Sequence, residues 1–276
     1  QPASFCGVVG LKPTYGAVSR FGLIALGSSL DQVGPFGKTV EDVEIVYDAI
    51  SGHDIFDSTS LPHEARKNTD KKKYTFGVPR HFLTEGIDSD VIELFENTLA
   101  KLKEKGHSIV DIELPRVKHS LAVYYVILPA EASSNLARYD GVRYGLYKEG
   151  ADLFEDYRLT RKEGFGREVK RRILLGTYVL SAGYYDSYYN KAQMIRALIT
   201  QDFDEAFKKI DAVLTPTTPS PAFTIGEKSD PLSMYLSDIF TVPANLTGMP
   251  ALSVPMGTVS RSEVHLPVGL QIMGPH

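Results

Sequence analysis

Two residues of opposite charge occupy positions where a charge is difficult to solvate. At 3.6 residues per turn, Arg172 falls beside the apolar face of its helix, whereas Arg171 points nearly opposite. That face consists of Val169, Ile173, Gly176 and Leu180. Asp238 is the only charged residue between positions 233 and 257. An unpaired buried charge is strongly destabilising, so each side chain needs a partner of opposite charge.

Arg172 and Asp238 together would suit a small ligand that carries both charges. A ligand with one carboxylate and one ammonium group needs a fixed cation and a fixed anion beside an apolar wall. The alternative is that the two residues pair with each other, or with unrelated neighbours, as buried structural ions. Their spacing alone favours this alternative.

The chain offers no recognisable nucleophile or metal site. No Ser is followed three residues later by Lys, no Gly-x-Ser-x-Gly elbow occurs, and Cys6 is the only Cys. The seven His residues are scattered, without His-x-x-x-His or Cys/His spacing. We therefore expect no catalytic residue and no metal site within this sequence.

The composition is that of a globular protein with a large core. The chain has 276 residues, of which 43% are hydrophobic, and a net charge of -4. That charge leaves no broad basic footprint, so any nucleic-acid contact should be local or belong to a partner. A single Cys excludes an internal disulfide and suits the reducing cytoplasm. The stretch 233–257 carries few charges, but its prolines interrupt a helix and Asp238 is a charged residue within it. Both features argue against a membrane-spanning helix.

The elements that must position these residues follow an α/β pattern. A capping box at 39–42 predicts a helix that ends before Gly52, and residues 53–73 resemble a surface loop. The order strand, helix, strand over 74–78, 90–105 and 108–114 predicts a parallel pair with a right-handed crossover. Helical patterns fill most of 121–209, and short buried strands are predicted at 211–215, 251–254 and 268–272. We expect an α/β fold with a mixed sheet.

Several motifs carry a resemblance to a known family. Residues 1–14 (QPASFCGVVGLKPT) and 28–35 (SSLDQVGP), in register, resemble the downstream half of the amidase signature. More narrowly, five motifs resemble the family of glutamyl-tRNA(Gln) amidotransferase A subunits: 131–136, 140–145, 163–166, 170–173 and 183–186. The resemblance implies an amidase signature fold, a mixed β-sheet layered between helices. Residues 1–276 would form the C-terminal part of one such domain.

The resemblance also implies an activity and its partners. In that family, the A subunit is a glutaminase that releases ammonia from glutamine, and the B subunit uses the ammonia to amidate Glu on tRNA(Gln). The amidotransferase B and C subunits would be partners, and ATP and magnesium would act on the B subunit. The family's Lys/Ser/Ser triad falls before Gln1, with the nucleophile three positions ahead of it, so we expect this chain alone to be inactive. The alternatives are a stand-alone amidase acting on another amide and a non-catalytic scaffold for partner subunits.

The same resemblance assigns roles to particular residues. The glutamine-binding Arg and Asp of the family fall on Arg172 and Asp238. The resemblance therefore favours a ligand-binding role for these two residues over a structural ion pair. A site Tyr falls on Tyr124, with Tyr125 as the alternative, and its ring would wall the pocket while its hydroxyl donates to the substrate. Other residues are expected to hold loops or to lie in solvent. Ser4, Lys12 and Asp31 are expected to hold the signature loops by hydrogen bonds, and Arg167, Lys170 and Arg171 to form a solvated helix face, or alternatively a contact to the B subunit or tRNA.

Overall fold

The structure is a computed structural model that describes residues 1–62, 71–83, 86–143, 145–228, 230–261 and 263–276. It divides into two compact units. Unit 1 contains residues 1–21, 32–121 and 196–276, and unit 2 contains residues 22–31 and 122–195. Part of the surface loop predicted at 53–73, residues 63–70, lies outside the described residues. The assignment of 1–276 to one domain stays a prediction.

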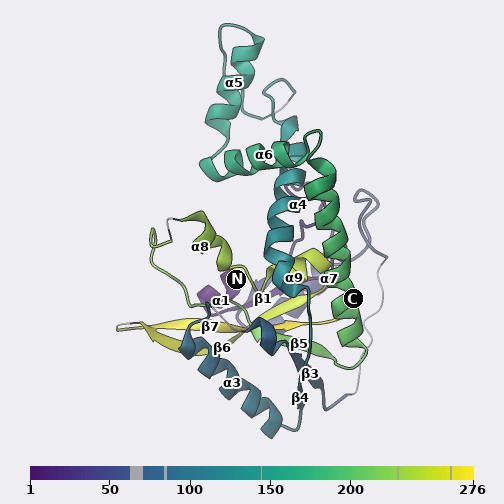
Figure 1. The fold of residues 1–276 in the computed structure, drawn as a ribbon, viewed down its shortest axis with the longest axis vertical. Coiled ribbons are helices and arrows are strands. Elements are labelled where there is room, and N and C mark those ends of the chain that lie inside the picture. The colour runs from purple at the N-terminus through teal and green to yellow at the C-terminus, as the bar shows by residue number, and fades with distance from the viewer. Residues whose placement is uncertain (63–70, 84–85, 144, 229, 262) are drawn as a thin grey trace. The chain divides into compact units, whose positions relative to one another are not determined.

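Unit 1 is built around one mixed sheet (Figure 1). The strands found in the described residues are ordered β2-β1-β6-β7-β5-β3-β4. β3 pairs in parallel with β4 and β5, and the other neighbours are antiparallel. This confirms the α/β prediction with a mixed sheet. The bounds are β1 Val9–Lys12, β2 Phe36–Gly37, β3 Thr75–Val78, β4 Ser108–Asp111, β5 Ala212–Pro216, β6 Ala251–Arg261 and β7 Val264–Met273.

Two helices of unit 1 begin and end close to where the sequence places them. α2 (Val40–Ile50) starts at a capping box, in which Asp42 N donates to Thr39 Oγ1 at 3.1 Å and Thr39 N donates to Asp42 Oδ2 at 3.0 Å. α3 (Ser89–Glu104) buries Val91, Phe95 and Leu99, one turn apart, and connects the parallel strands β3 and β4. Both elements are specified by local sequence.

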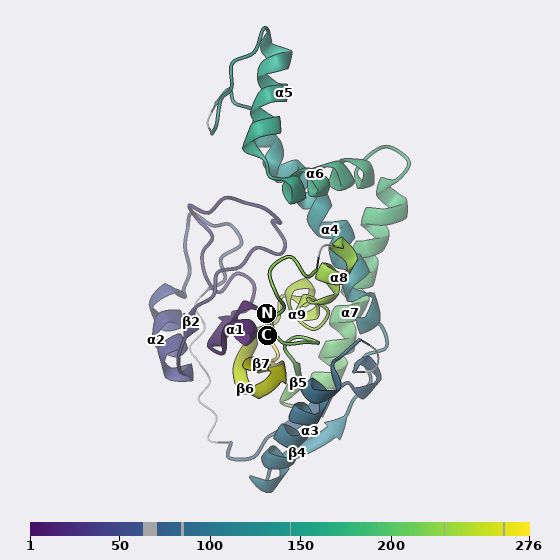
Figure 2. The ribbon, with the colours of Figure 1, turned by 90° about the vertical axis from the view of Figure 1, so that its left-hand side faces the viewer.

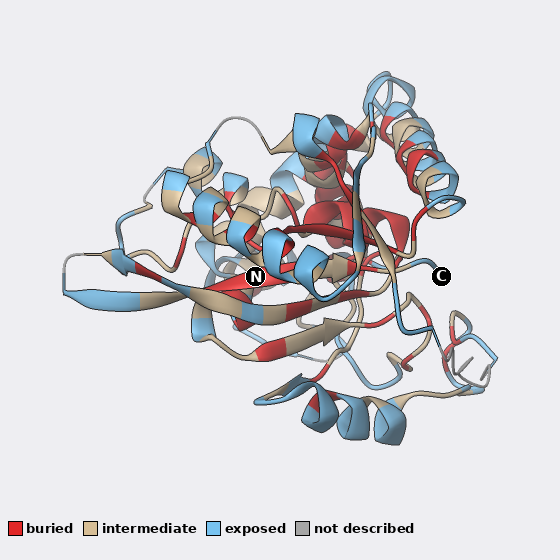
Figure 3. Cartoon of the chain, turned by 90° about the horizontal axis from the view of Figure 1, so that it is seen from below, coloured by how far each residue is buried: buried red, intermediate tan, exposed pale blue. Residues whose placement is uncertain are grey.

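Helices cover the two faces of the sheet. Leu270 in β7 belongs to a buried cluster with Phe95 and Leu99 of α3. A side chain at the next position, Gly269, would point to the opposite face of the sheet. A Cβ added there would lie 2.9 Å from the Cβ of Ser4 in α1 (Pro2–Cys6), so α1 covers this second face. The short helices α8 (Pro231–Leu236) and α9 (Val242–Thr247) follow β5 in the chain. All five residues of β5 are buried, and Figure 3 shows buried residues on both strands and helices.

The β6–β7 hairpin is much longer than the sequence predicts. Expected strands at 251–254 and 268–272 extend to Ala251–Arg261 and Val264–Met273. Pro255 and Pro267 argue against a strand in the sequence, because proline cannot donate a hydrogen bond to a neighbouring strand. A register shift lies between Pro255 and Gly257. The prediction covered only the buried half of each strand, because that half alone carries a continuous apolar run.

Unit 2 is helical. It holds most of α4 (Ser120–Asn135), the short η3 (Leu136–Arg138), α5 (Leu153–Gly164), α6 (Arg167–Val179), the π-helical turn η4 (Asp186–Asn190) and the start of α7 (Lys191–Phe207). α6 lies between α5 and α4 (Figure 2). The unit boundary falls within α4 and within α7. No described helix combines the length and apolar character needed to span a bilayer.

Candidate functional site

Arg172 on α6 is held by an acidic residue one turn earlier. Its Nε donates to Glu168 Oε1 at 3.0 Å, and its side chain is 21% exposed. Arg171 Nη1 donates to the other carboxylate oxygen, Glu168 Oε2, at 2.6 Å, but the Arg171 side chain is 40% exposed. Arg172 is therefore the inward-facing arginine of the pair, as the helical phase predicts.

Tyr124 on α4 meets the same guanidinium. Its hydroxyl shares a hydrogen bond with Arg172, and its ring packs edge-on against Tyr125 with centroids 4.9 Å apart. Burial acts to lower the pKa of Arg172, but the hydrogen bonds to Glu168 and Tyr124 outweigh it and raise that pKa above its usual value. The result is a permanently charged, fixed cation beside a phenol. Tyr124, the tyrosine that the resemblance favours, is in contact with Arg172.

A glycine allows the two helices to meet. A Cβ added at Gly176 of α6 would lie 1.8 Å from the carbonyl oxygen of Pro129 in α4. Only a residue without a side chain permits this approach of one backbone to another. Gly176 lies one turn after Arg172, so the same approach brings Arg172 to Tyr124. The close packing of α6 on α4 at Gly176 thus accounts for the geometry of the pair.

Asp238 belongs to unit 1, in the turn between α8 and α9. Its backbone carbonyl accepts from Thr241 N and Val242 N, both at 3.0 Å. The Asp238 carboxylate lies close enough to the backbone nitrogen of Gln1 to interact with it electrostatically. Asp238 therefore lies within electrostatic reach of the start of the signature segment. The structure brings Tyr124 and Arg172 together in unit 2, and it places Asp238 in unit 1.

Buried polar groups fix the turn that carries Asp238. Gln271 Nε2 donates to the carbonyl oxygen of Phe240 at 2.7 Å and to Thr215 Oγ1 at 3.0 Å. Ser4 Oγ accepts from Gly269 N at 2.8 Å, and Thr217 and Ser253 share a hydroxyl contact at 2.9 Å. Gln271 thus ties β7 to β5 and to the segment before α9, and Ser4 ties α1 to β7.

Asp31 and Lys12 also hold signature loops, as predicted. Asp31 accepts from Leu26 N at 2.8 Å and from Gly27 N at 3.0 Å, which closes the loop at 26–31. Lys12 Nζ donates to the carbonyl oxygen of Pro13 at 3.0 Å and to Gln32 Oε1 at 2.9 Å. Burial lowers the pKa of Lys12 to about 7.

Sequence reasoning missed Glu168, the residue that orients Arg172. An acid four positions before a basic residue on one helix is a recognisable pairing signal, and it was available here. In the described part of the chain, no cluster of His, Cys, Asp and Glu has the arrangement of a metal site.

The sequence of the chain is similar to those of known proteins. The family model for "Amidase" matches residues 1–276. The chain belongs to the amidase family. Among curated relatives of this amidase, the glutamyl-tRNA(Gln) amidotransferase A subunit of Thermodesulfovibrio yellowstonii is 57% identical, and that of Carboxydothermus hydrogenoformans is 56% identical. Each alignment covers 99% of this chain but 57% of the relative, so the amidase chain spans little more than half the length of these proteins.

Solved structures bear out the predicted amidase fold. The crystal structure of the glutamyl-tRNA(Gln) amidotransferase A subunit from Thermotoga maritima matches with a TM-score of 0.78 and 44% identity, over 100% of this chain and 56% of that one. A crystal structure described as an amidase matches with a TM-score of 0.73 and 27% identity, over 99% of this chain and 55% of that one. The mixed sheet with flanking helices is thus the fold of this amidase family member.

Proposed function

We propose that the chain is the glutamine-binding part of a glutamyl-tRNA(Gln) amidotransferase A subunit. The contact between Tyr124 and Arg172 is the single observation that carries this proposal, because it fixes a half-buried cation beside a phenol. Relatives at 56–57% identity bear that name and support the choice of enzyme. In this proposal Arg172 binds the α-carboxylate of glutamine, Asp238 binds its α-ammonium, and Tyr124 forms a wall and donates a hydrogen bond.

The chemistry requires residues upstream of Gln1. A serine there attacks the side-chain carboxamide of glutamine, and a lysine and a bridging serine move the protons. The C–N bond breaks, ammonia leaves with the proton it has received, and water then hydrolyses the acyl-enzyme to glutamate. The residues of this chain bind and orient the substrate, and Glu168 holds Arg172 in place. On this basis the chain alone releases no ammonia.

The whole assembly is part of the proposal. The B subunit receives the ammonia and amidates Glu on tRNA(Gln), with ATP and magnesium bound to that same partner, and the C subunit completes a cytoplasmic heterotrimer. The tRNA is contacted mainly through the B subunit. The net charge of -4 suits a protein that leaves most tRNA contacts to a partner.

The test compares glutamine with an amide that lacks both charges. Ammonia release from glutamine and from propionamide is measured for the chain extended upstream through the signature and assembled with the B and C subunits. Arg172→Ala should raise the KM for glutamine by about 30-fold or more, since a desolvated charge contact contributes roughly 2–5 kcal/mol. It should change the KM for propionamide far less.

Arg171→Ala is the matched control, because Arg171 contacts the same Glu168 but is the more exposed arginine. Its glutamine kinetics should stay within about twofold of wild type. Equal losses on both amides in Arg172→Ala would assign Arg172 a structural role. A wild-type assembly that prefers propionamide would indicate a general amidase instead.

A further inference from the structure

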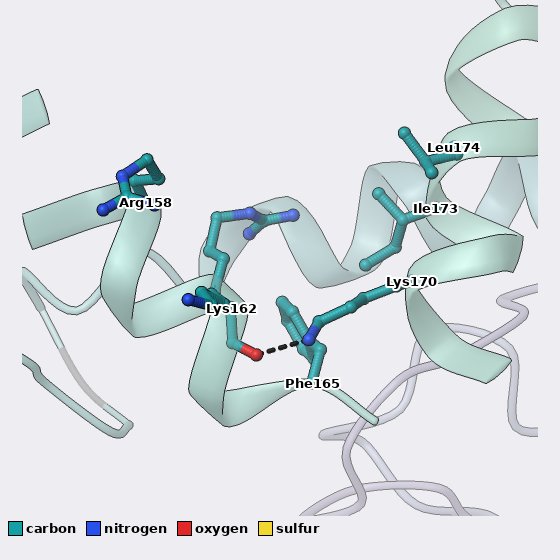
Figure 4. Close-up of a pocket in the computed structure, with 7 residues that line it drawn as sticks. Arg158, Lys162, Phe165, Lys170, Ile173 and Leu174 are labelled. Atoms are coloured by element: carbon teal, nitrogen blue, oxygen red, sulfur yellow. Dashed lines mark hydrogen bonds between the residues drawn. The ribbon is translucent and has the colours of Figure 1, made fainter. Parts of the chain in front are cut away.

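A cavity lies in unit 2, between α5 and α6 (Figure 4). Its volume is about 340 Å³, at the lower end of the range for ligand pockets. Four of its lining side chains are cationic and three are apolar, and among the described residues no carboxylate lines it. The lining residues are Arg158, Arg161, Lys162, Phe165, Lys170, Ile173 and Leu174. None of them takes part in the proposed glutamine site.

Arg161 is the fixed cation of this basic pocket. Its Nη1 donates to the carbonyl oxygens of Leu136 at 3.2 Å and Tyr139 at 3.1 Å. The guanidinium carbon also lies 5.0 Å from the centre of the Phe165 ring, in a cation–π contact. These contacts use Nη1 and one face of the Arg161 guanidinium plane, so the other guanidinium nitrogens keep N–H donors for a ligand. It is pre-organised to bind an anion without a large loss of side-chain entropy.

Three further cations surround it. Lys170 Nζ donates to the backbone carbonyl of Lys162, as Figure 4 shows. Lys170 is partly exposed, and this bond anchors its side chain at the cavity. Lys162 is exposed, and Arg158 is exposed and pairs with Glu155. Clustered cations in a chain of net charge -4 create a local positive field that attracts carboxylates.

The remaining wall is apolar. Leu174 is 73% exposed, and Figure 4 shows it beside Ile173 on the side opposite Arg158 and Lys162. An exposed leucine beside a cavity is unfavourable in water and gains when another apolar group covers it. The surface that faces the cavity is therefore mainly apolar, and the polar ends of the four cationic side chains form only a small part of it.

We propose that this basic pocket docks a short acidic segment of a partner protein. The segment would place one aliphatic or aromatic side chain against Ile173 and Leu174, and flanking carboxylates on Arg161, Lys162 and Arg158. Single-stranded RNA fits less well, because it needs exposed aromatic platforms along a basic track. Among the described lining residues Phe165 is the only aromatic one, and Arg161 already covers a face of it.

The test measures fluorescence anisotropy of short labelled peptides titrated with the full chain. The probe peptide carries one leucine flanked by glutamates, and its controls replace either the glutamates by glutamine or the leucine by alanine. A uridine oligonucleotide of similar length serves as the RNA probe. Lys162→Glu and Leu174→Ser are the test variants, since both side chains are exposed and should tolerate replacement. Lys103→Glu on α3 and Leu232→Ser on α8 are the matched controls.

The acidic leucine peptide should bind with micromolar affinity, and more weakly as salt is raised. Each test variant, and each peptide control, should weaken binding about tenfold or more, whereas Lys103→Glu and Leu232→Ser should not. Absence of binding, or binding that the test variants leave unchanged, would overturn the proposal. Tighter binding of the oligonucleotide than of the peptide would overturn it in favour of RNA.

Discussion

At the scale of single residues, the most unusual group is the ammonium of Lys12. Its two hydrogen-bond acceptors are neutral oxygens, from Pro13 and Gln32, and burial lowers its pKa to about 7. Gln32 in turn donates to Asn245 Oδ1 at 2.9 Å, so Lys12 links the signature strand to α9. The neutral amine can keep both bonds, whereas the charged form loses hydration and meets no carboxylate among the residues that the structure describes.

Lys12 should therefore give the folding stability a distinctive pH dependence. The unfolded chain holds the proton up to the usual lysine pKa of 10.5, but the folded chain releases it at about 7. Between these values the unfolded state binds more protons, so stability should rise with pH, by up to about 1.4 kcal/mol per unit. Urea unfolding from about pH 7 to pH 9 should show this slope in wild type and lack it in Lys12→Met.

Lys103→Met on the exposed side of α3 is the control, and it should keep the wild-type slope. Parallel stability profiles for wild type and Lys12→Met would mean that Lys12 stays charged in the folded protein.

At the scale of elements, the close approach of α6 to α4 depends on Gly176. Alanine at this position would place a Cβ 1.8 Å from the Pro129 carbonyl oxygen, and backbone cannot move away as a flexible side chain can. Gly176→Ala should lower the free energy of unfolding by about 1–3 kcal/mol or more, measured by urea denaturation. In the extended, assembled enzyme it should also raise the KM for glutamine, because Arg172 and Tyr124 lie on the two displaced helices.

Gly166→Ala at the start of α6 tests whether the contact, rather than glycine itself, matters. Nothing lies within 4 Å of a Cβ added there. It should change stability by less than about 1 kcal/mol. If both alanine variants were equally stable, the two helices would not be in close contact in solution.

At the scale of the whole molecule, unit 1 exposes an ordered apolar cluster. Phe21 and Phe56 are 65% and 69% exposed, with ring centroids 5.0 Å apart, and Ile55 is 80% exposed. Hydrogen bonds fix the two loops that carry them: Ser19 Oγ donates to Asp54 Oδ2 at 2.6 Å and Arg20 N to Asp57 Oδ2 at 2.8 Å. A fixed apolar cluster in water favours association.

The 276-residue chain should therefore self-associate as its concentration rises. Sedimentation velocity should show a concentration-dependent shift that the double variant Phe21→Ser with Phe56→Ser reduces. Leu232→Ser, at a position 62% exposed on α8, should leave the shift unchanged. A wild-type chain that sediments as a monomer at all concentrations would contradict this prediction.

Elements specified by near neighbours were predicted well from the sequence. The capping box of α2 depends on residues three apart, and the buried face of α3 depends on spacings of about one turn. The parallel pairing of β3 with β4 follows because a helix between two strands forces a crossover. The full length of the β6–β7 hairpin was not predicted, because its outer part has little burial to impose a pattern.

By itself the sequence determined the α/β class, the family and the inward position of Arg172, since these depend on motifs and local periodicity. Only the tertiary structure decided that Tyr124 meets Arg172, and that Lys170 lies at a cavity and reaches the backbone of Lys162. Such contacts join helices that are distant in sequence. They are set by how closely backbones pack, as at Gly176, and no periodicity within one helix records that distance.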